Sequence, residues 1–154
     1  MNMGGWNYAF QNFDSTKHVR AAMREKTISH KHAREIAVAI KGLSLEKARD
    51  YLLSVVELKR SIPFRRYKNL VGHRTDPGVM SGRYPQKAAK EILKLIDNLE
   101  SNAEYKGIDL DRLRIINATV HKGRLLKRFI PRAMGRATAK NNVFTHVELV
   151  AQEV

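Results

Sequence analysis

The most regular hydrophobic pattern in the chain lies between Pro85 and Gly107. Apolar residues recur there at helical spacing, at Ala88, Ile92, Leu95, Leu99 and Ala103. A repeat of three and four residues predicts an amphipathic helix, with Pro85 in its first turn and Gly107 as the residue that ends it. We therefore expect one long helix with a single buried face in this segment.

Two shorter helices are predicted upstream by the same spacing. The first follows Ser29, whose hydroxyl is a favourable N-cap, and ends at Gly42. Its apolar positions are Ala33, Ile36, Ala37 and Ile40. The second follows Ser44, has Glu46 in its first turn and runs to about Arg60. Its apolar positions are Leu45, Ala48, Leu52, Val55 and Val56. The short turn between the two helices predicts that they pack near each other.

Three segments show a strand pattern instead of a helical one. Between Lys17 and Ile28, the residues Val19, Ala21 and Met23 alternate with Arg20, Ala22 and Arg24. This alternation predicts a half-buried strand with a basic outer face. Residues 112–120 and 143–151 are rich in β-branched residues, which favour strands. The second of these places Val143, Thr145, Val147, Leu149 and Ala151 on one face.

Two segments follow neither period. The first 14 residues mix glycine, Asn and Gln with aromatic residues, and they predict an irregular arm with aromatic anchors. Those aromatic residues are Trp6, Tyr8, Phe10 and Phe13. Residues 61–83 are punctuated by Pro63, Gly72, Pro77, Gly78 and Gly82. A loop of this length is usually functional or disordered.

The loop over residues 61–83 carries the motif Pro63-Phe64-Arg65-Arg66-Tyr67. Two arginines between aromatic rings suit base stacking combined with phosphate binding. The rings are equally suited to anchoring the loop on the core, and the sequence leaves both interpretations open. Further cations in or beside the loop are Lys68, Arg74, Arg83 and Lys87.

Charge narrows the class of partner. The 154 residues contain 29 Lys and Arg against 15 Asp and Glu, a net charge of +14, which favours nucleic acid or an anionic membrane. A hydrophobic fraction of 43% is enough for one core, so we expect a single domain over residues 1–154. No apolar run approaches the roughly 20 residues that span a bilayer, and no signal-peptide layout opens the chain. We expect an intracellular, soluble protein without a membrane partner.

The basic charge is concentrated between Asp111 and Glu148, where no acidic residue occurs. The cations of this gap are Arg112, Arg114, Lys122, Arg124, Lys127, Arg128, Arg132, Arg136 and Lys140. Because two strand-like segments flank it, residues 121–141 are predicted to form a hairpin arm, too polar and cationic to join the domain's own core. A solvated basic loop is the alternative, but solubility alone does not require so long an acid-free stretch.

The sequence shows no recognisable catalytic or cofactor-binding motif. The chain has no Cys, which excludes disulfides, thiolate zinc sites and cysteine nucleophiles. His30 and His32 are two residues apart and point to different faces of a helix, so they cannot share a metal ion. The sequence contains neither the G-x-x-x-x-G-K motif nor the G-x-G-x-x-G motif, the glycine-rich loops that bind nucleotide phosphates. We expect no cofactor, no metal and no enzymatic activity.

Three motifs together resemble a known family. They are Gly82-Arg83-Tyr84-Pro85-Gln86-Lys87-Ala88-Ala89, Asn102-Ala103-Glu104-Tyr105-Lys106-Gly107 and Pro131-Arg132-Ala133-Met134-Gly135-Arg136-Ala137. In this order they resemble the large-subunit ribosomal protein twenty-two family, called seventeen in eukaryotic naming, from about Lys17 to Ala151. Ile62 to Tyr67 and the loop after them look like the archaeal and eukaryotic insertion, which makes the resemblance archaeal rather than bacterial. Ser29-His30-Lys31-His32-Ala33 resembles the family's Ser-Pro-Lys-His-Ala, with His30 in place of the usual proline.

The resemblance implies a fold, a location and partners. The fold is α+β, with three helices packed on a small three-stranded antiparallel sheet and a long β-hairpin extension. The location is the large subunit of the cytoplasmic ribosome. The implied partners are large-subunit ribosomal RNA, neighbouring large-subunit ribosomal proteins and the nascent polypeptide, and no homo-oligomer is expected.

The resemblance also implies two groups of site residues. Ribosomal RNA would contact Lys31, His32, Arg65, Arg66, Lys68, Arg74, Arg83, Lys87, His121, Lys122, Arg124, Lys127, Arg128, Arg132, Arg136 and Lys140. The tip of the arm, which would line the nascent-peptide exit tunnel, would comprise Phe129, Ile130, Pro131, Ala133, Met134 and Gly135.

Two other functions use the same residues. A DNA-architectural protein would insert a basic arm into a minor groove and wedge Ile130 or Met134 between bases beside Pro131. An RNA-processing enzyme would need His73 or His121 to converge with Asp76 or another carboxylate on one phosphate. The sequence shows no such pair at useful spacing.

Overall fold

The computed structural model describes residues 7–154, so the predicted anchor Trp6 lies outside the described residues. The helices are α1 (His30–Ile40), α2 (Leu45–Val56) and α3 (Gln86–Lys106). The strands are β1 (His18–Lys26), β2 (Ile62–Pro63), β3 (Gly82–Arg83), β4 (Leu113–Leu126), β5 (Phe129–Pro131), β6 (Ala137–Ala139) and β7 (Asn142–Glu153). An α+β fold with three helices and antiparallel sheet is confirmed. The short pair β2–β3 was not predicted, whereas β5–β6 lies within the predicted hairpin arm.

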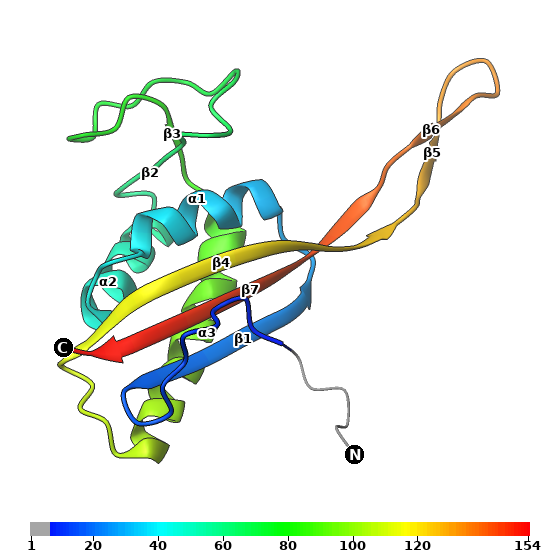
Figure 1. Ribbon diagram of the computed structural model, residues 1–154. Helices are drawn as coiled ribbons and strands as arrows, with labels where there is room; N and C mark the ends of the chain where they lie inside the picture. The colour runs from blue at the N-terminus through cyan, green and yellow to red at the C-terminus, as the bar shows by residue number, and fades with distance from the viewer. Residues whose placement is uncertain (1–6) are drawn as a thin grey trace, which may run out of the picture.

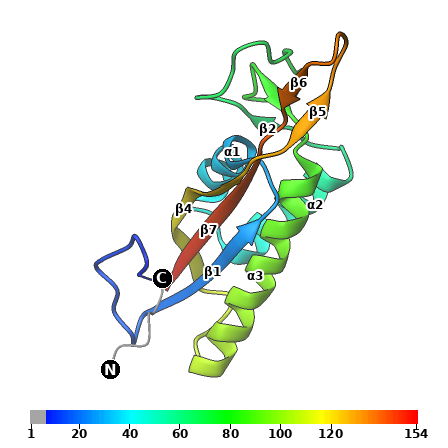
Figure 2. The same ribbon diagram turned by 90° about the vertical axis from the view of Figure 1, so that its right-hand side faces the viewer.

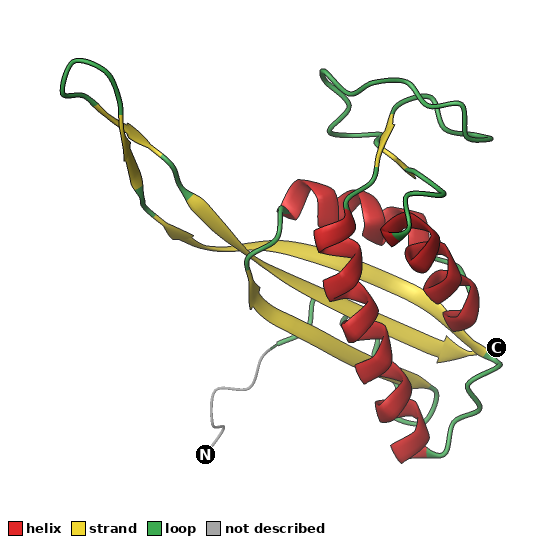
Figure 3. Cartoon of the chain, turned by 180° about the vertical axis from the view of Figure 1, so that it is seen from behind, coloured by secondary structure: helices red, strands yellow, loops and turns green. Residues whose placement is uncertain are grey.

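The main sheet has the strand order β1-β7-β4, with antiparallel pairing on both sides of β7. All three helices cover one face of this sheet (Figure 3). Val19 pairs with Ala151, Ala21 with Leu149 and Met23 with Val147, which puts apolar side chains of both strands on the same face. The alternation predicted for β1 is confirmed, because Val19, Ala21 and Met23 are buried whereas Arg20 and Arg24 are exposed.

The core lies between this face and the helices. Its helical part includes the predicted positions Ile36, Ile40, Leu52, Ile92 and Leu99, each with 0% exposure. Ala89 and Ile96 belong to it without having been predicted, and the predicted Val56 is only partly buried. Removal of so many branched side chains from water is the main term that stabilises the fold. Arg49 of α2 also forms ion pairs with Asp97 and Glu100 of α3, which fixes these two helices against each other at the surface.

Two of the predicted helix ends, at Ser29 and Gly107, are confirmed, and the predicted end of the second helix is wrong. The Ser29 hydroxyl accepts the backbone N–H of His32 at 3.5 Å, so His30 in place of proline does not remove the cap. Gly107 ends α3 in the left-handed conformation. The second helix was predicted to reach Arg60, but it ends at Val56. Residues 57–60 are charged or exposed, and without a buried side chain to extend the apolar face the chain turns at Leu58, whose φ is 64°.

The opposite face of the sheet is crossed by residues 7–17 (Figure 1). The backbone N–H of Ala9 donates to Glu148 Oε2 at 2.9 Å. The Arg20 guanidinium lies 4.6 Å from the centre of the Tyr8 ring and 4.4 Å from that of Phe13. These rings are the aromatic anchors predicted for the N-terminal segment, and they explain why Glu148 is buried on a face that the helices do not reach.

Two extensions leave the body: one leaves from the end of the sheet and the other rises above α1 (Figures 1 and 2). One is the paired ribbon in which β4 and β7 continue beyond the sheet and are followed by β5 and β6. The other is the loop between α2 and α3, which includes the short β2–β3 pair. The first turn of α1 lies between the two extensions. Among the described residues, no helix combines the length and apolar character needed to cross a membrane.

Candidate nucleic-acid interface

Residues 121–141, here called the arm, form an antiparallel ribbon along most of their length. Leu125 pairs with Val143, and farther out Phe129 pairs with Ala139 and Pro131 with Ala137. The turn is closed by the Arg132 N–H, which donates to the Arg136 carbonyl at 2.8 Å. Met134 and Gly135 occupy the left-handed region at the end of the ribbon, with φ of 58° and 64°. Residues 124–141 are all exposed, so the ribbon has no core of its own.

The cations predicted on the arm fall into two groups. The five on the outer part of the arm have no carboxylate partner within the described part of the chain: Lys127, Arg128, Arg132, Arg136 and Lys140. Nearer the body, the Arg124 guanidinium forms an ion pair with Glu25 at 3.2 Å. His121 Nε2 lies 3.9 Å from Glu148 Oε1. The outer part of the arm therefore presents uncompensated charge, whereas its base is fixed to the body.

The base of the arm contains a close approach at Gly123. Pairing is in register at Lys122 and Thr145 and again at Leu125 and Val143, with a bulge between. A Cβ at Gly123 would lie 2.7 Å from His146 Nε2 and 3.1 Å from the Phe144 carbonyl oxygen. The His146 ring is itself held, because its Nδ1 accepts the Glu25 N–H at 3.1 Å. Only glycine allows the two strands to approach this closely.

We expect Gly123→Ala to destabilise the protein by about 1–3 kcal/mol, because the added methyl overpacks this junction. Chemical denaturation measures the loss. Gly72→Ala is the matched control, since a Cβ there meets no atom within 4 Å. Equal free energies of unfolding for the two variants would show that the junction tolerates the methyl group.

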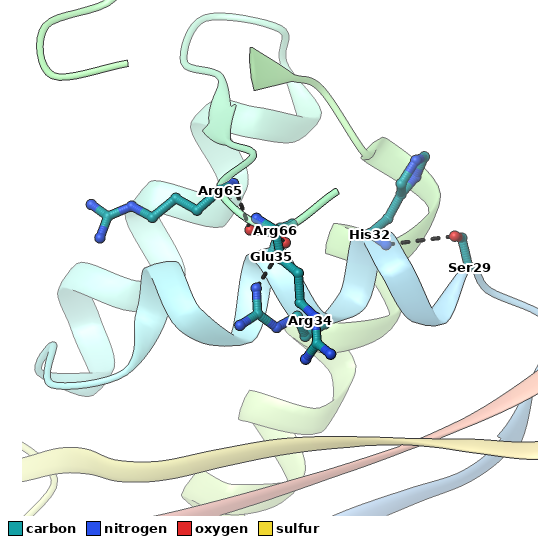
Figure 4. A network of polar contacts seen from close by, with 6 residues as sticks. All are labelled: Ser29, His32, Arg34, Glu35, Arg65 and Arg66. Atoms are coloured by element: carbon teal, nitrogen blue, oxygen red, sulfur yellow. Dashed lines mark hydrogen bonds and ion pairs between the residues drawn. The ribbon is translucent and has the colours of Figure 1, made fainter. Parts of the chain in front are cut away.

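The loop between α2 and α3 is anchored on a buried carboxylate (Figure 4). Glu35 of α1 is 1% exposed. Its oxygens accept the backbone N–H groups of Arg65 at 3.0 Å and Arg66 at 3.2 Å, and the Arg34 guanidinium at 2.9 Å. Burial acts to raise the pKa of Glu35, but these donors together hold that pKa below its ordinary value. The carboxylate is therefore ionised and fixes the chain direction of the loop at neutral pH.

A second anchor lies within the loop. The Asp76 carboxylate accepts the Ser61 N–H at 2.8 Å and also the Ser61 hydroxyl, and these hydrogen bonds lower the pKa of Asp76. Arg74 Nε donates to the Gly82 carbonyl at 3.1 Å, and its guanidinium lies 5.0 Å from the centre of the Tyr84 ring. The loop is therefore braced by its own polar residues.

These contacts do not form an acid–base pair. In the described chain no hydrogen bond or ion pair joins Asp76 to a histidine. The Glu148 carboxylate, which approaches His121, also accepts the Ala9 N–H and the Thr119 hydroxyl. Residues 7–154 contain no cluster of three metal-ligating side chains.

The predicted RNA-binding residues outside the arm gather in three hollows. Lys31, His32, Arg66 and Arg83 line one of about 290 Å³. Lys31 also lines a hollow of about 410 Å³ at the base of the arm, together with Lys87. Arg65 lies elsewhere, in a hollow of about 510 Å³ between α1, α2 and the loop. The Glu35 anchor separates the side chains of Arg65 and Arg66, and Lys68 stands exposed on the loop.

The aromatic residues of the loop motif have different surroundings. Phe64 is 5% exposed and belongs to the core, which supports the anchoring interpretation for this ring. Tyr67 is half-buried at the edge of the 290 Å³ hollow. For Tyr67, base stacking stays a prediction.

Sequence reasoning missed the residues that position the interface. Glu35, Glu25, Asp76 and Glu148 each hold one of the extensions or the N-terminal segment in place. The scarcity of acidic residues was the one signal that could have identified them. In so basic a chain each carboxylate has many possible cationic or N–H partners, so each is a candidate anchor.

Comparisons with known proteins give consistent matches. A family model described as ribosomal protein L22p/L17e matches residues 21–152. The large ribosomal subunit protein uL22 of Nitrosopumilus maritimus is 74% identical over 152 residues, covering 99% of this chain and 100% of its own length. The proteins of the same name from Cenarchaeum symbiosum and Archaeoglobus fulgidus are 68% and 51% identical, and each match covers at least 98% of both chains.

Proposed function

Because the chain belongs to the ribosomal protein L22p/L17e family, we propose that it binds large-subunit ribosomal RNA and that its arm lines the nascent-peptide exit tunnel. The family resemblance drawn from the three motifs is confirmed, and it is to archaeal members. The protein is a structural constituent of the large subunit of the cytoplasmic ribosome and not an enzyme.

The observation that carries the RNA-binding proposal is the row of uncompensated cations on the arm. A two-stranded ribbon with no core is only marginally stable by itself. Phosphates placed against Lys127, Arg128, Arg132, Arg136 and Lys140 would neutralise their mutual repulsion and release counterions. The ribbon is therefore expected to be most stable within RNA, so its folding is coupled to binding.

The remaining predicted RNA contacts support a continuous binding surface. Lys31 is shared by two hollows, one beside the loop and one at the base of the arm. RNA that follows the arm toward the body would meet the first turn of α1 next, and then Arg66 and Arg83 of the loop. We assign Lys122 and Arg124 to the base of this surface. Arg74 belongs to its far side, where it braces the loop.

The tip differs from the rest of the arm in chemistry. Met134 is 90% exposed, Phe129 69% and Ile130 38%, so these apolar side chains do not pack in the protein's own core. A cluster of exposed apolar residues, such as the one at the tip of the arm, is typical of a contact surface. We propose that Phe129 to Gly135 form part of the tunnel wall and face the nascent polypeptide. Neighbouring large-subunit proteins would contact the globular body, and the single arm favours a monomer.

A single thiol at the tip tests the tunnel proposal. The chain contains no Cys, so Met134→Cys introduces the only one. In ribosomes assembled with this variant, we expect a short thiol-reactive cross-linker to join residue 134 to a stalled nascent chain. Tyr105→Cys is the control, because Tyr105 is 93% exposed on the body. Cross-linking from residue 105 but not from residue 134 would contradict a tip in the tunnel.

A further inference from the structure

The hollow between the first turn of α1 and the loop has an unusual lining. Its volume is about 290 Å³, close to the lower end of the roughly 300–1,000 Å³ typical of small-ligand sites. It is lined by cations, aromatic rings, the Asn69 amide and Val71, without one acidic residue. By contrast, the 510 Å³ hollow beside it includes Glu35 and Asp50.

Tyr67 is half-buried in the lining of this hollow, and the His30 ring lies nearly perpendicular to it at 6.4 Å between centroids. The Lys31 ammonium and the Arg66 guanidinium lie 5.7 Å and 5.9 Å from the centre of its ring. No hydrogen bond ties its hydroxyl to any described residue, whereas the hydroxyl of Tyr51 donates to the Ser61 carbonyl. Phe64 is only 5% exposed and makes a T-shaped contact with the His32 ring at 5.4 Å between centroids.

His32 offers polar atoms within the same hollow. Its side chain points away from α1, toward the loop (Figure 4). Burial, together with the charges of Arg83 and Lys31, lowers the pKa of His32, so the imidazole is neutral at neutral pH. A neutral imidazole provides one donor and one acceptor, as the edge of a nucleobase does.

We propose that this hollow takes one unpaired nucleotide of the RNA, with its base against Tyr67 and its flanking phosphates on Lys31, Arg66 and Arg83. This inference rests on the proposed function and specifies its ligand at one site. Bases in a duplex are stacked on each other and cannot reach a ring in a hollow, whereas a looped-out base can. Lys31 and Arg66 near the ring, and Arg83 in the same lining, match the phosphates that flank such a nucleotide.

The Glu35 anchor gives the hollow its shape. It holds the backbone of Arg65 and Arg66 on α1, so that the Arg66 side chain and Tyr67 line this hollow while Arg65 lines the other. A pre-formed site loses less conformational entropy when the nucleotide binds.

Two probes of equal charge test the proposal. One is an oligouridylate of about ten nucleotides, and the other is an abasic ribose-phosphate oligomer of the same length. We expect the full-length protein to bind the base-containing oligomer about tenfold tighter at low salt. Tyr67→Leu should lower this ratio at least about threefold without changing the affinity for the abasic oligomer. Tyr67→Phe, which keeps the ring, and Tyr105→Leu, on the body, should retain the ratio.

The proposal is overturned if Tyr67→Leu keeps the wild-type ratio, or if Tyr105→Leu lowers the ratio equally. Should Tyr67→Leu fail to fold, the wild-type protein is cross-linked to an oligomer that contains 4-thiouridine. Attachment at residues 64–71 supports the site, and attachment confined to the arm refutes it. If the protein binds ribosomal RNA through the arm but binds the base-containing and abasic oligomers equally well, only this inference fails. If it does not bind ribosomal RNA, the proposed function fails as well.

Discussion

Replacing Lys127, Arg128, Arg132, Arg136 and Lys140 by glutamine should weaken binding to large-subunit ribosomal RNA at least about a hundredfold at low salt. Each phosphate contact releases counterions, so each contributes to the slope of log affinity against log salt concentration. Five lost contacts would flatten this slope by roughly four. The binding constant measured at several salt concentrations gives both quantities. None of these side chains has an ion-pair partner in the described chain, so the fold should not depend on them.

The matched control removes five cations from the body: Lys41, Lys47, Lys59, Lys94 and Arg112. It changes net charge by the same amount but leaves the arm intact. We expect a small loss of affinity from the lower overall charge and a nearly unchanged slope. Equal losses in the two variants would mean that net charge drives binding and that the arm has no special part in it.

Glu35→Ala should lower the free energy of unfolding by about 2–4 kcal/mol and release the loop from α1. The substitution leaves the backbone N–H groups of Arg65 and Arg66 without the acceptor that Glu35, only 1% exposed, provides. Denaturant unfolding measures the loss, and amide exchange at residues 65 and 66 reports the loop. Glu46→Ala, an exposed residue in the first turn of α2, should change stability by only about 0.5 kcal/mol. A similar small change in Glu35→Ala would show that another contact anchors the loop.

The same carboxylate makes stability depend on acid. Because the pKa of Glu35 is lower in the folded protein than its ordinary value, its contribution is fully present above that ordinary value. The contribution is lost as pH falls through the lowered pKa. Asp76, whose pKa is also lowered, adds to the effect in the same direction. In Glu35→Ala, stability should therefore fall less steeply with acid than in the wild-type protein.

Most helices and strands could be located from the sequence, because the buried residues recur with the period of a helix or of a strand. The helical repeat of α3 and the alternation of β1 each mark a face that packs on one core, so local spacing was enough. The predicted end of α2 was wrong by four residues, because Glu57, Leu58, Lys59 and Arg60 are compatible with a helix and only the lack of packing ends it. The arm was visible because its charge excludes it from any core.

The anchors were not visible because they depend on contacts between distant segments. Glu35 lies on the side of α1 away from the sheet, where a carboxylate usually faces water. It is buried only because a loop thirty residues farther along the chain folds over it. Glu148 is likewise buried by the N-terminal segment. No local sequence pattern shows which segment will cover which face. The placement of Arg65 and Arg66 in two different hollows is therefore visible only in the folded structure.

Amide hydrogen exchange of residues 121–141, compared between the free protein and isolated large subunits, tests the insertion of the arm into RNA most directly. Residues 45–56 of α2 serve as the internal reference, since the core protects them in both states. We expect rapid exchange of the arm in the free protein and strong protection in the subunit, because RNA and not the protein's own core covers it. An arm that exchanges at the same rate in both states would contradict this account.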